Sequence, residues 1–205
     1  MKDRKLLNIE LGRITADEYV HGRPESGVVL VLDNIRSAHN VGSAFRTADA
    51  FGVDKIYLGG ICPVPPSPEL RKVALGAEEV VPFEHVDDVV ALVKRLQADG
   101  YTVVAVEQTV HSVKLDEWGK AEGDAHAAAH WPFLSAAACA SLRPGGGEQP
   151  ASGKRIALVF GNEVAGVQQE VVDACDLSLE IPQQGTKHSL NVSVSIGVVL
   201  WGIRH

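Results

Sequence analysis

Short runs of apolar, often β-branched residues divide this chain, and segments with helical periodicity separate them. Most of the runs are apolar on both faces, as expected for inner strands of a parallel sheet that is covered on both sides. Segments 40–51 and 86–99 each stop just before a glycine, Gly52 and Gly100, the residue that favours the turn past a helix end. This alternation predicts an α/β fold. The predicted strands are 28–33 (VVLVLD), 55–59 (KIYLG), 79–83 (EVVPF), 101–107 (YTVVAVE), 155–161 (RIALVFG) and 177–181 (LSLEI).

Two segments fall outside this alternation. Residues 1–26 are predicted to form a short helical extension, in which Thr15 and Glu18 would make a capping box. Residues 112–153 join an Ala/His-rich stretch to a tract of Gly, Pro and Ser that is typical of a flexible loop. We therefore expect a helical extension followed by a single domain over 27–205, with an insertion at 112–153.

The charge of the chain gives conflicting indications about nucleic acid. The formal net charge is −7, and contacts to phosphate require cations. Residues 1–80, however, hold ten Lys and Arg against eleven Asp and Glu, so a basic face could lie on an acidic body. Composition alone therefore leaves RNA binding open.

The cysteine count and the apolar runs indicate the compartment. Cys62, Cys139 and Cys175 stand far apart and form no CxxC pair. This sparse, odd count argues against a disulfide framework and for a reducing compartment. No run approaches the roughly eighteen apolar residues of a membrane span, and the N-terminal residues lack the apolar stretch of a signal peptide. We expect a cytoplasmic protein that does not enter a membrane.

Several common cofactor and metal signatures do not fit the sequence. No GxGxxG motif follows any predicted strand, which argues against a nicotinamide-dependent oxidoreductase. The pair Gly153 and Lys154 has the wrong spacing for a phosphate-binding loop and precedes a strand instead of following one. His126 and His130 would share a helical face, but no third zinc ligand is evident. We expect no metal site.

A first cluster of polar residues, LDNIRSAHNVGSAFRTADAFGV (32–53), runs from a strand end into a helix. It contains Asn40 and Arg46, and Gly42 lies near the predicted helix start, where backbone N–H groups are free to meet an anion. Taken alone, the pattern is equally that of an Asn cap, a Gly turn and a surface Arg.

Two further clusters follow late strands. LVFGNEVAGV (158–167) ends a buried strand in a glycine-bracketed loop with Asn162 and Glu163, and glycines let a backbone approach a ligand closely. In EIPQQGTKHSLNVSVSIGVVLW (180–201), a Gly-centred loop leads through Ser189 and Asn191 into an amphipathic helix. Taken singly, these are also the patterns of an ordinary strand-to-helix turn and of a helix cap.

In this order, the three clusters resemble the three motifs of the SpoU (TrmH-like) branch of the SPOUT methyltransferases. Those motifs are an Asn…Arg helix start, FGNE after a late strand, and IPxxGxxxSLNVS before the last helix. The resemblance covers about residues 27–111 and 154–203. It implies S-adenosylmethionine as the cofactor and transfer of its methyl group to a ribose 2′-hydroxyl of RNA. It also implies a Rossmann-like parallel sheet with a C-terminal deep trefoil knot, and a homodimer whose active site is completed across the interface.

The resemblance assigns roles to individual residues as well. Arg46 would hold the phosphate of the target nucleotide and polarise its 2′-hydroxyl, since a guanidinium stays protonated and is a poor base. Asn40, Glu163, Ser189 and Asn191 would orient the reacting groups. Residues expected to form the cofactor pocket are Val106, Glu107, Gly161, Asn162, Ile181, Ser189 and Leu190.

Within that pocket, apolar Ile181 and Leu190 would sandwich the adenine, and Glu107 would accept the ribose hydroxyls of the cofactor. The chemistry needs no metal, because a sulfonium methyl group is already a good electrophile. Alignment of the poorly nucleophilic hydroxyl is the larger gain, since orientation contributes several kcal/mol.

The substrate is less constrained by the sequence. Transfer RNA is favoured over ribosomal RNA, because small relatives that lack an extra RNA-binding domain often act on it. Methylation of a base nitrogen is one alternative, although the Asn40…Arg46 helix and the SLNVS ending favour ribose. Another alternative is a catalytically silent RNA-binding assembly factor. The intact set of Arg46, Glu163, Ser189 and Asn191 argues against it.

Overall fold

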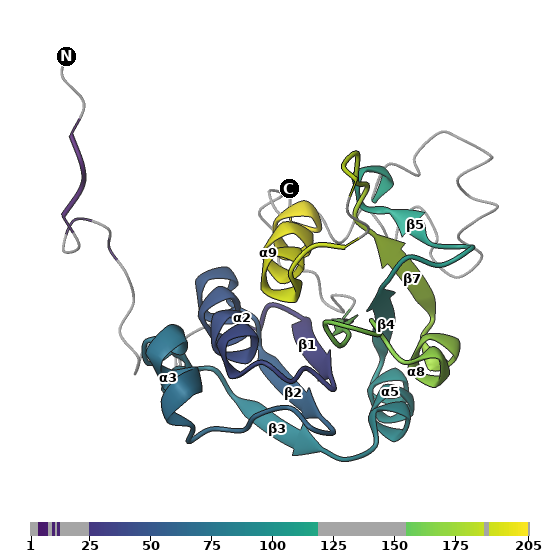
Figure 1. The fold of residues 1–205 in the computed structure, drawn as a ribbon, viewed down its shortest axis with the longest axis horizontal. Helices are drawn as coiled ribbons and strands as arrows, with labels where there is room; N and C mark the ends of the chain where they lie inside the picture. Colours follow the sequence, from purple (N-terminus) through teal and green to yellow (C-terminus); the bar gives the residue numbers. More distant parts are fainter. Residues whose placement is uncertain are drawn as a thin grey trace.

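The computed structural model describes residues 4–7, 10, 12, 25–118, 155–186 and 189–204. Within them, seven strands form one sheet in the order β3-β2-β1-β6-β4-β7-β5, and every pair is parallel (Figure 1). The predicted α/β class with a parallel sheet is confirmed. The strands are β1 (Val28–Asp33), β2 (Lys55–Gly59), β3 (Phe83–Val86), β4 (Tyr101–Val106), β5 (Val113–Lys114), β6 (Arg155–Phe160) and β7 (Leu177–Glu180).

Helices cover both faces of the sheet (Figure 1). Helices α2, α3, α4 and α9 pack on one face, and α5 and α8 pack on the other. Their bounds are α2 (Ala38–Phe51), α3 (Pro68–Ala74), α4 (Ala77–Val80), α5 (Val89–Ala98), α8 (Gln169–Ala174) and α9 (Val192–Gly202). No helix in the described part of the chain is long and apolar enough to cross a bilayer.

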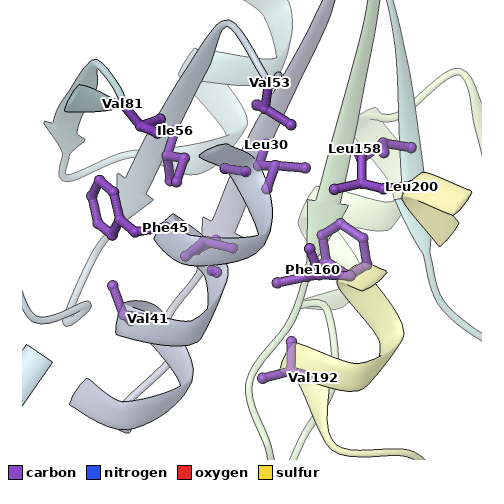
Figure 2. Close-up of a cluster of buried hydrophobic side chains, with 14 of the residues drawn as sticks. Leu30, Val41, Phe45, Val53, Ile56, Val81, Leu158, Phe160, Val192 and Leu200 are labelled. Atoms are coloured by element: carbon purple, nitrogen blue, oxygen red, sulfur yellow. The ribbon is translucent and has the colours of Figure 1, made fainter. Parts of the chain in front are cut away.

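The inner strands contribute apolar side chains to two hydrophobic clusters, one on each face of the sheet. Leu30 and Leu32 of β1 point toward α2 and α9, while Val29 and Val31 point toward α5 and α8. Figure 2 shows the cluster on the α2 and α9 side of the sheet, with Leu30 of β1, Phe45 of α2, Phe160 of β6 and Leu200 of α9 among its members. Burying one such side chain fully contributes roughly 1.5–3 kcal/mol, so the central strands fix the positions of the loops that follow them.

Helix α2 is fixed at both ends and along its length. The Ser37 hydroxyl accepts a hydrogen bond from the backbone N–H of Asn40 and caps its start. Gly52, with φ of 62°, ends the helix as predicted. Gly42 lies in the helix itself and faces α3, where an added Cβ would press on the carbonyl oxygen of Leu70. Gly42 therefore permits close helix packing, a role that the sequence did not indicate.

The strand predicted at 79–83 is wrong. Ala77–Val80 is helical, and the strand that pairs with β2 is Phe83–Val86. β3 is an edge strand whose side chains alternate between exposed and partly buried, so it lacks the continuous apolar run of the inner strands.

The sheet extends into the segment assigned to the insertion. Val113–Lys114 pairs with β7 as its outer neighbour, and the short 3₁₀ helix η2 (Leu115–Glu117) follows. The Leu115 side chain packs so closely on Gly202 that an added Cβ would meet it at 2.9 Å. Other predictions lie outside the described residues; these concern Thr15, Glu18, His126, His130, Cys139, Gly153 and Lys154.

Candidate active site

The carboxyl ends of four neighbouring strands, β1, β6, β4 and β7, meet at one edge of the parallel sheet. The chain leaves β1 through residues 34–37, β6 through 161–168 and β7 through 181–191. Ligands of open α/β sheets bind outside the carboxyl ends of the strands. All three polar clusters of the sequence therefore converge on the expected edge.

The start of α2 is already occupied by an anion from the protein itself. The Glu163 carboxylate accepts hydrogen bonds from the backbone N–H groups of Arg36 (3.3 Å) and Ser37 (3.2 Å). These two N–H groups lie just before the first helical residue, and within the first turn the N–H of Asn40 is bonded to the Ser37 hydroxyl. Binding of an external anion near Gly42 stays a prediction. A carboxylate at this position also has a favourable interaction with the helix dipole.

One chain of hydrogen bonds connects the three clusters. Asn191 Nδ2 donates to Asn40 Oδ1 (3.2 Å), and Asn40 Nδ2 donates to Glu163 Oε1 (2.9 Å). Asn191 Oδ1 is itself occupied as the cap of α9, because it accepts from the backbone N–H of Ser193 (2.9 Å). Each amide therefore has one orientation that satisfies both neighbours, and the chain ends on the carboxylate.

Hydrogen bonds keep the Glu163 carboxyl ionised. Burial is the largest single influence on its pKa and acts to raise it. The hydrogen bonds from Asn40 and from the backbone of Arg36 and Ser37 together outweigh burial and hold the pKa below its ordinary value. Glu163 is therefore an acceptor that ties α2 to the 161–168 loop.

The 161–168 loop is a tight hairpin. Asn162 and Gly166 exchange two backbone hydrogen bonds of 2.8 and 2.9 Å. Asn162 Oδ1 accepts from the N–H of Val164, and its Nδ2 donates to the carbonyl of Asn34 (2.7 Å). Gly161 crosses the returning arm so closely that a Cβ there would overlap the backbone of Gly166. Asn162 thus organises the loop instead of projecting into open space.

These loops enclose a cavity of about 520 Å³ at the strand ends. Every residue predicted for the cofactor pocket lines it, and so do Glu163 and Asn191. Apolar Val106, Ile181 and Leu190 share the wall with the polar 161–163 backbone, a mixture typical of small-molecule sites. The structure therefore brings the predicted cofactor residues together, although their roles stay predictions.

Arg46 stands apart from this group. It is exposed on α2, does not line the cavity, and makes no hydrogen bond or ion pair with any described residue. Asn40, by contrast, is held directly by Glu163. Three of the five predicted catalytic residues, Glu163, Ser189 and Asn191, therefore line the cavity. Asn40 is hydrogen-bonded to two of them, and Arg46 lies on the exposed surface of α2.

A larger cavity of about 1010 Å³ lies beside the first, between the end of β4, α8 and the start of β7. The two share Glu107, Gln108 and Ala165 in their walls. The larger one contains no residue of 181–191, so volume alone does not identify the active site. The smaller cavity is the candidate active site, because all three clusters line or adjoin it.

The sequence reasoning missed two residues at the end of β1. Asp33 is fully buried and accepts from the N–H of Gln168 (3.0 Å). Asn34 has a positive φ of 54°, and its Oδ1 accepts from the N–H of Ile61. The available signal was a polar Asp-Asn pair directly after an apolar strand, with Asn tolerant of the left-handed conformation.

No group of three or more His, Cys, Asp or Glu residues in the described ranges is arranged to hold a metal ion. The two described cysteines are separate and free. Burial raises the pKa of Cys62 to about 12, which keeps this thiol protonated and unreactive.

The comparison with known families identifies the fold's relatives. The sequence profile of the SpoU rRNA Methylase family matches residues 27–201. The chain belongs to this family. The family predicted from the three motifs is therefore confirmed.

Among its relatives is the 23S rRNA (guanosine-2′-O-)-methyltransferase RlmB of Coxiella burnetii. It is 29% identical over 184 residues, which are 89% of this chain and 60% of that protein. The chain therefore spans about three fifths of the length of this curated SpoU relative.

Solved structures of the family are similar as well. The A. aeolicus TrmH/SpoU tRNA modifying enzyme has a TM-score of 0.67 and 25% identity, over 92% of this chain and 78% of that one. The AdoMet-bound rRNA methyltransferase from Sinorhizobium meliloti has a TM-score of 0.66 and 24% identity, over 88% and 56%. The second likeness concerns the fold alone.

Proposed function

We propose that this protein transfers a methyl group from S-adenosylmethionine to a ribose 2′-hydroxyl of RNA. The observation that carries the proposal is the hydrogen-bond chain Asn191–Asn40–Glu163, which unites all three motifs at one cavity. Membership of the SpoU rRNA Methylase family supports the same activity.

The smaller cavity fits the cofactor in size and character. Its volume of about 520 Å³ lies within the range of small-molecule sites. Ile181 and Leu190 would contact the adenine ring, and backbone groups of 161–163 would hydrogen-bond its edge. When bound, the cofactor supplies a methyl group that is already electrophilic. The protein's task is then to align the hydroxyl with it.

The residues divide into those that hold the site and one that meets the substrate. Asn40, Glu163 and Asn191 are committed to each other by hydrogen bonds, so they keep α2 in place against the cofactor loops. Arg46 keeps its donors toward solvent. A guanidinium holds a phosphate through two parallel hydrogen bonds, which suits Arg46 to binding the target nucleotide.

Ribosomal RNA is the preferred substrate in this proposal, ahead of transfer RNA. The RlmB relatives carry the name of 23S rRNA guanosine-2′-O-methyltransferases, while the A. aeolicus relative is named a tRNA modifying enzyme. This order reverses the preference for transfer RNA drawn from the sequence. The deep trefoil knot of the C-terminal segment stays a prediction.

We also propose a homodimer that forms through α9. Val194, Val198 and Trp201 are 49%, 37% and 59% exposed, whereas Ile196, Val199 and other residues of α9 face the core. An exposed apolar helix face of this kind is typical of a subunit interface. Light scattering should give about twice the chain mass of 21.8 kDa, and Trp201→Glu should shift it toward that single mass.

The activity is tested first by titration calorimetry with S-adenosylhomocysteine, which should show one site per chain. Purified protein is then supplied with labelled S-adenosylmethionine and total RNA from a strain lacking this protein. Nucleoside mass spectrometry of the product should show a 2′-O-methylated nucleotide. A methylated base nitrogen would favour the alternative methyltransferase, and cofactor binding without transfer would favour a silent assembly factor.

The assignment of Arg46 is tested in the same assay. Arg46→Ala should retain cofactor affinity but reduce transfer by about a hundredfold to a thousandfold, the typical effect of losing one preorganised transition-state contact. Arg46→Lys should restore little, since a point charge lacks the two-pronged geometry. Lys94→Ala, which removes an exposed cation from α5 on the opposite face, is the matched control and should have parent activity. Parent-like transfer by Arg46→Ala would remove Arg46 from the site.

A further inference from the structure

We propose that Asp33 and Glu107 are positioning residues that hold two consecutive backbone N–H groups of the 161–168 loop and thereby set the wall of the cofactor cavity. The inference rests on the proposed function, because it assumes that the smaller cavity receives the cofactor. It also gives Glu107 a task other than the acceptance of ribose hydroxyls that the family resemblance implied.

Asp33 acts from the end of β1. Its Oδ2 accepts from the N–H of Gln168 (3.0 Å), and its Oδ1 accepts from Nδ2 of Asn34 (2.8 Å). Asp33 has an exposed fraction of 0% and lines neither cavity. Any influence of Asp33 on a ligand must therefore pass through the loop that it holds.

Glu107 acts from the end of β4, on the adjacent amide. Its Oε2 accepts from the N–H of Val167 (3.0 Å), and its Oε1 accepts from the N–H of Gln108 (2.9 Å). The carboxylate fills the space beside Gly166, where φ is +71° and a Cβ would collide with it. The returning arm of the loop is thus fitted to this side chain.

The hydrogen bonds to Val167 and Gln168 affect the cavity wall through the hairpin. Asn162 and Gly166 are joined by two backbone hydrogen bonds, so the outgoing arm follows the returning arm. The outgoing arm carries Gly161 and Glu163, which line the cavity. A displacement of Val167 and Gln168 would therefore move the cavity wall and pull Glu163 away from the start of α2.

The buried charge of Asp33 gives a second reason to expect a positional role. None of the described Lys or Arg residues forms an ion pair with it, and its partners are one backbone N–H and one side-chain amide. A carboxylate without a cationic partner is costly to bury, so stability alone does not favour it. An aspartate here is explained by the position that it imposes on the loop.

Asp176 provides a control that makes the same kinds of hydrogen bond as Asp33 but from an exposed position. Its Oδ2 accepts from the backbone N–H of Val103 (2.7 Å), and its Oδ1 accepts from Nε2 of Gln97 (3.0 Å). Like Asp33, it is a carboxylate that holds a backbone amide between elements, but it acts in the first half of β4, away from the cofactor loop. Asp176→Asn therefore reports the general cost of losing such a carboxylate.

The experiment compares Asp33→Asn, Glu107→Gln and Asp176→Asn by thermal unfolding, by calorimetry with S-adenosylhomocysteine, and by hydrogen exchange without ligand. Asp33→Asn should weaken cofactor binding by about tenfold, the equivalent of one charged hydrogen bond. The amides of 161–168 should exchange faster in Asp33→Asn and Glu107→Gln. Asp176→Asn should lose melting temperature yet keep parent affinity and parent exchange in 161–168.

Parent-like affinity together with parent-like exchange of 161–168 in Asp33→Asn would overturn the inference. An equal loss of cofactor affinity in Asp176→Asn would also overturn it, because the loss would then follow from removing any such carboxylate. If Asp33→Asn does not fold, hydrogen exchange of Glu107→Gln measured without ligand decides the question. Without ligand, the loss of a direct contact between Glu107 and the cofactor cannot change the exchange rate. A parent protein that binds no cofactor contradicts the proposed function instead, and the exchange comparison still tests the positioning role.

Discussion

Two loops form the walls of the same cavity, and they are held in different ways. Loop 161–168 is cross-linked by its own backbone hairpin. Asp33 and Glu107 bind its returning arm, and its Glu163 binds the backbone just before α2. In the loop after β7, the described residues 182–186 and 189–190 make no hydrogen bond, and they are exposed. One wall is therefore fixed by hydrogen bonds within the fold, whereas the described residues of the other wall have none.

A pair of glycine substitutions should separate the two loops most strongly. Gly161→Ala places a Cβ on the backbone of Gly166 and Val167, neither of which is free to move. We expect a loss of about 3 kcal/mol in the free energy of unfolding, as for a severe overpacking. At Gly185 an added Cβ meets nothing within 4 Å, so Gly185→Ala should stay within about 0.5 kcal/mol of the parent.

Chemical denaturation of the two variants measures this difference. Equal losses of stability would show that the loop after β7 is as closely packed as the hairpin, and the contrast between them would not hold. Near-parent stability of Gly161→Ala would mean that the hairpin adapts readily.

Glu163→Gln tests the link between the hairpin and α2. The neutral amide keeps one acceptor oxygen and turns its NH₂ toward the N–H of Arg36 or toward the donors of Ser37 and Asn40. We expect a loss of about 1 kcal/mol, modest because the side chain is solvent-exposed.

The contribution of Glu163 to the free energy of unfolding should depend on pH. The folded pKa of Glu163 lies below the ordinary value of 4.5, so its contribution is present above pH 4.5 and is lost as pH falls through the lowered pKa. The difference in unfolding free energy between parent and Glu163→Gln should therefore be largest near neutral pH and shrink in acid. A difference that is independent of pH would contradict the ionised role of Glu163.

Leu190→Ala should have the smallest effect, and on binding alone. Leu190 is 41% exposed and lines the cavity, so its truncation removes little from the core but part of a ligand contact. Affinity for S-adenosylhomocysteine should fall about threefold, close to the effect of losing one methylene group from a partly exposed contact. Ile61→Ala, which truncates a 59% exposed side chain outside the cavity, is the control. A larger loss of stability than of affinity in Leu190→Ala would place Leu190 in the core.

The difference between the walls also explains which parts of the site the sequence could predict. Cavity residues such as Gly161, Ile181 and Leu190 were identified through the three sequence motifs and the family that these resemble, and all three line the cavity. The tasks of Asp33 and Glu107 depend on partners 135 and 60 residues away, and no local pattern encodes such a pairing. The contact of Glu163 with the residues just before α2 was not predicted for the same reason, since Glu163 lies 126 residues from Ser37.

The fold was predictable where burial is continuous. β1, β4 and β6 run through the centre of the sheet and are apolar on both faces, so their sequences identify them. The edge strand β3 carries Glu84 and His85 among half-buried neighbours, and the adjacent apolar letters belong to α4. Periodicity alone does not separate a short apolar helix from a strand.

In the hydrogen-bond chain Asn191–Asn40–Glu163, each asparagine donates to the next residue, so a change from asparagine to aspartate at position 40, by mutation or by deamidation, would be unfavourable. Aspartate has nearly the shape of asparagine and is one base change away, yet at position 40 it would set a carboxylate oxygen against Glu163 Oε1. Deamidation would make the same change without any mutation. Val41 and Val192, the branched residues after the two asparagines, hinder the ring closure that deamidation requires, and both are buried. The neighbours that anchor these helices in the core thus also protect the amides on which the site depends.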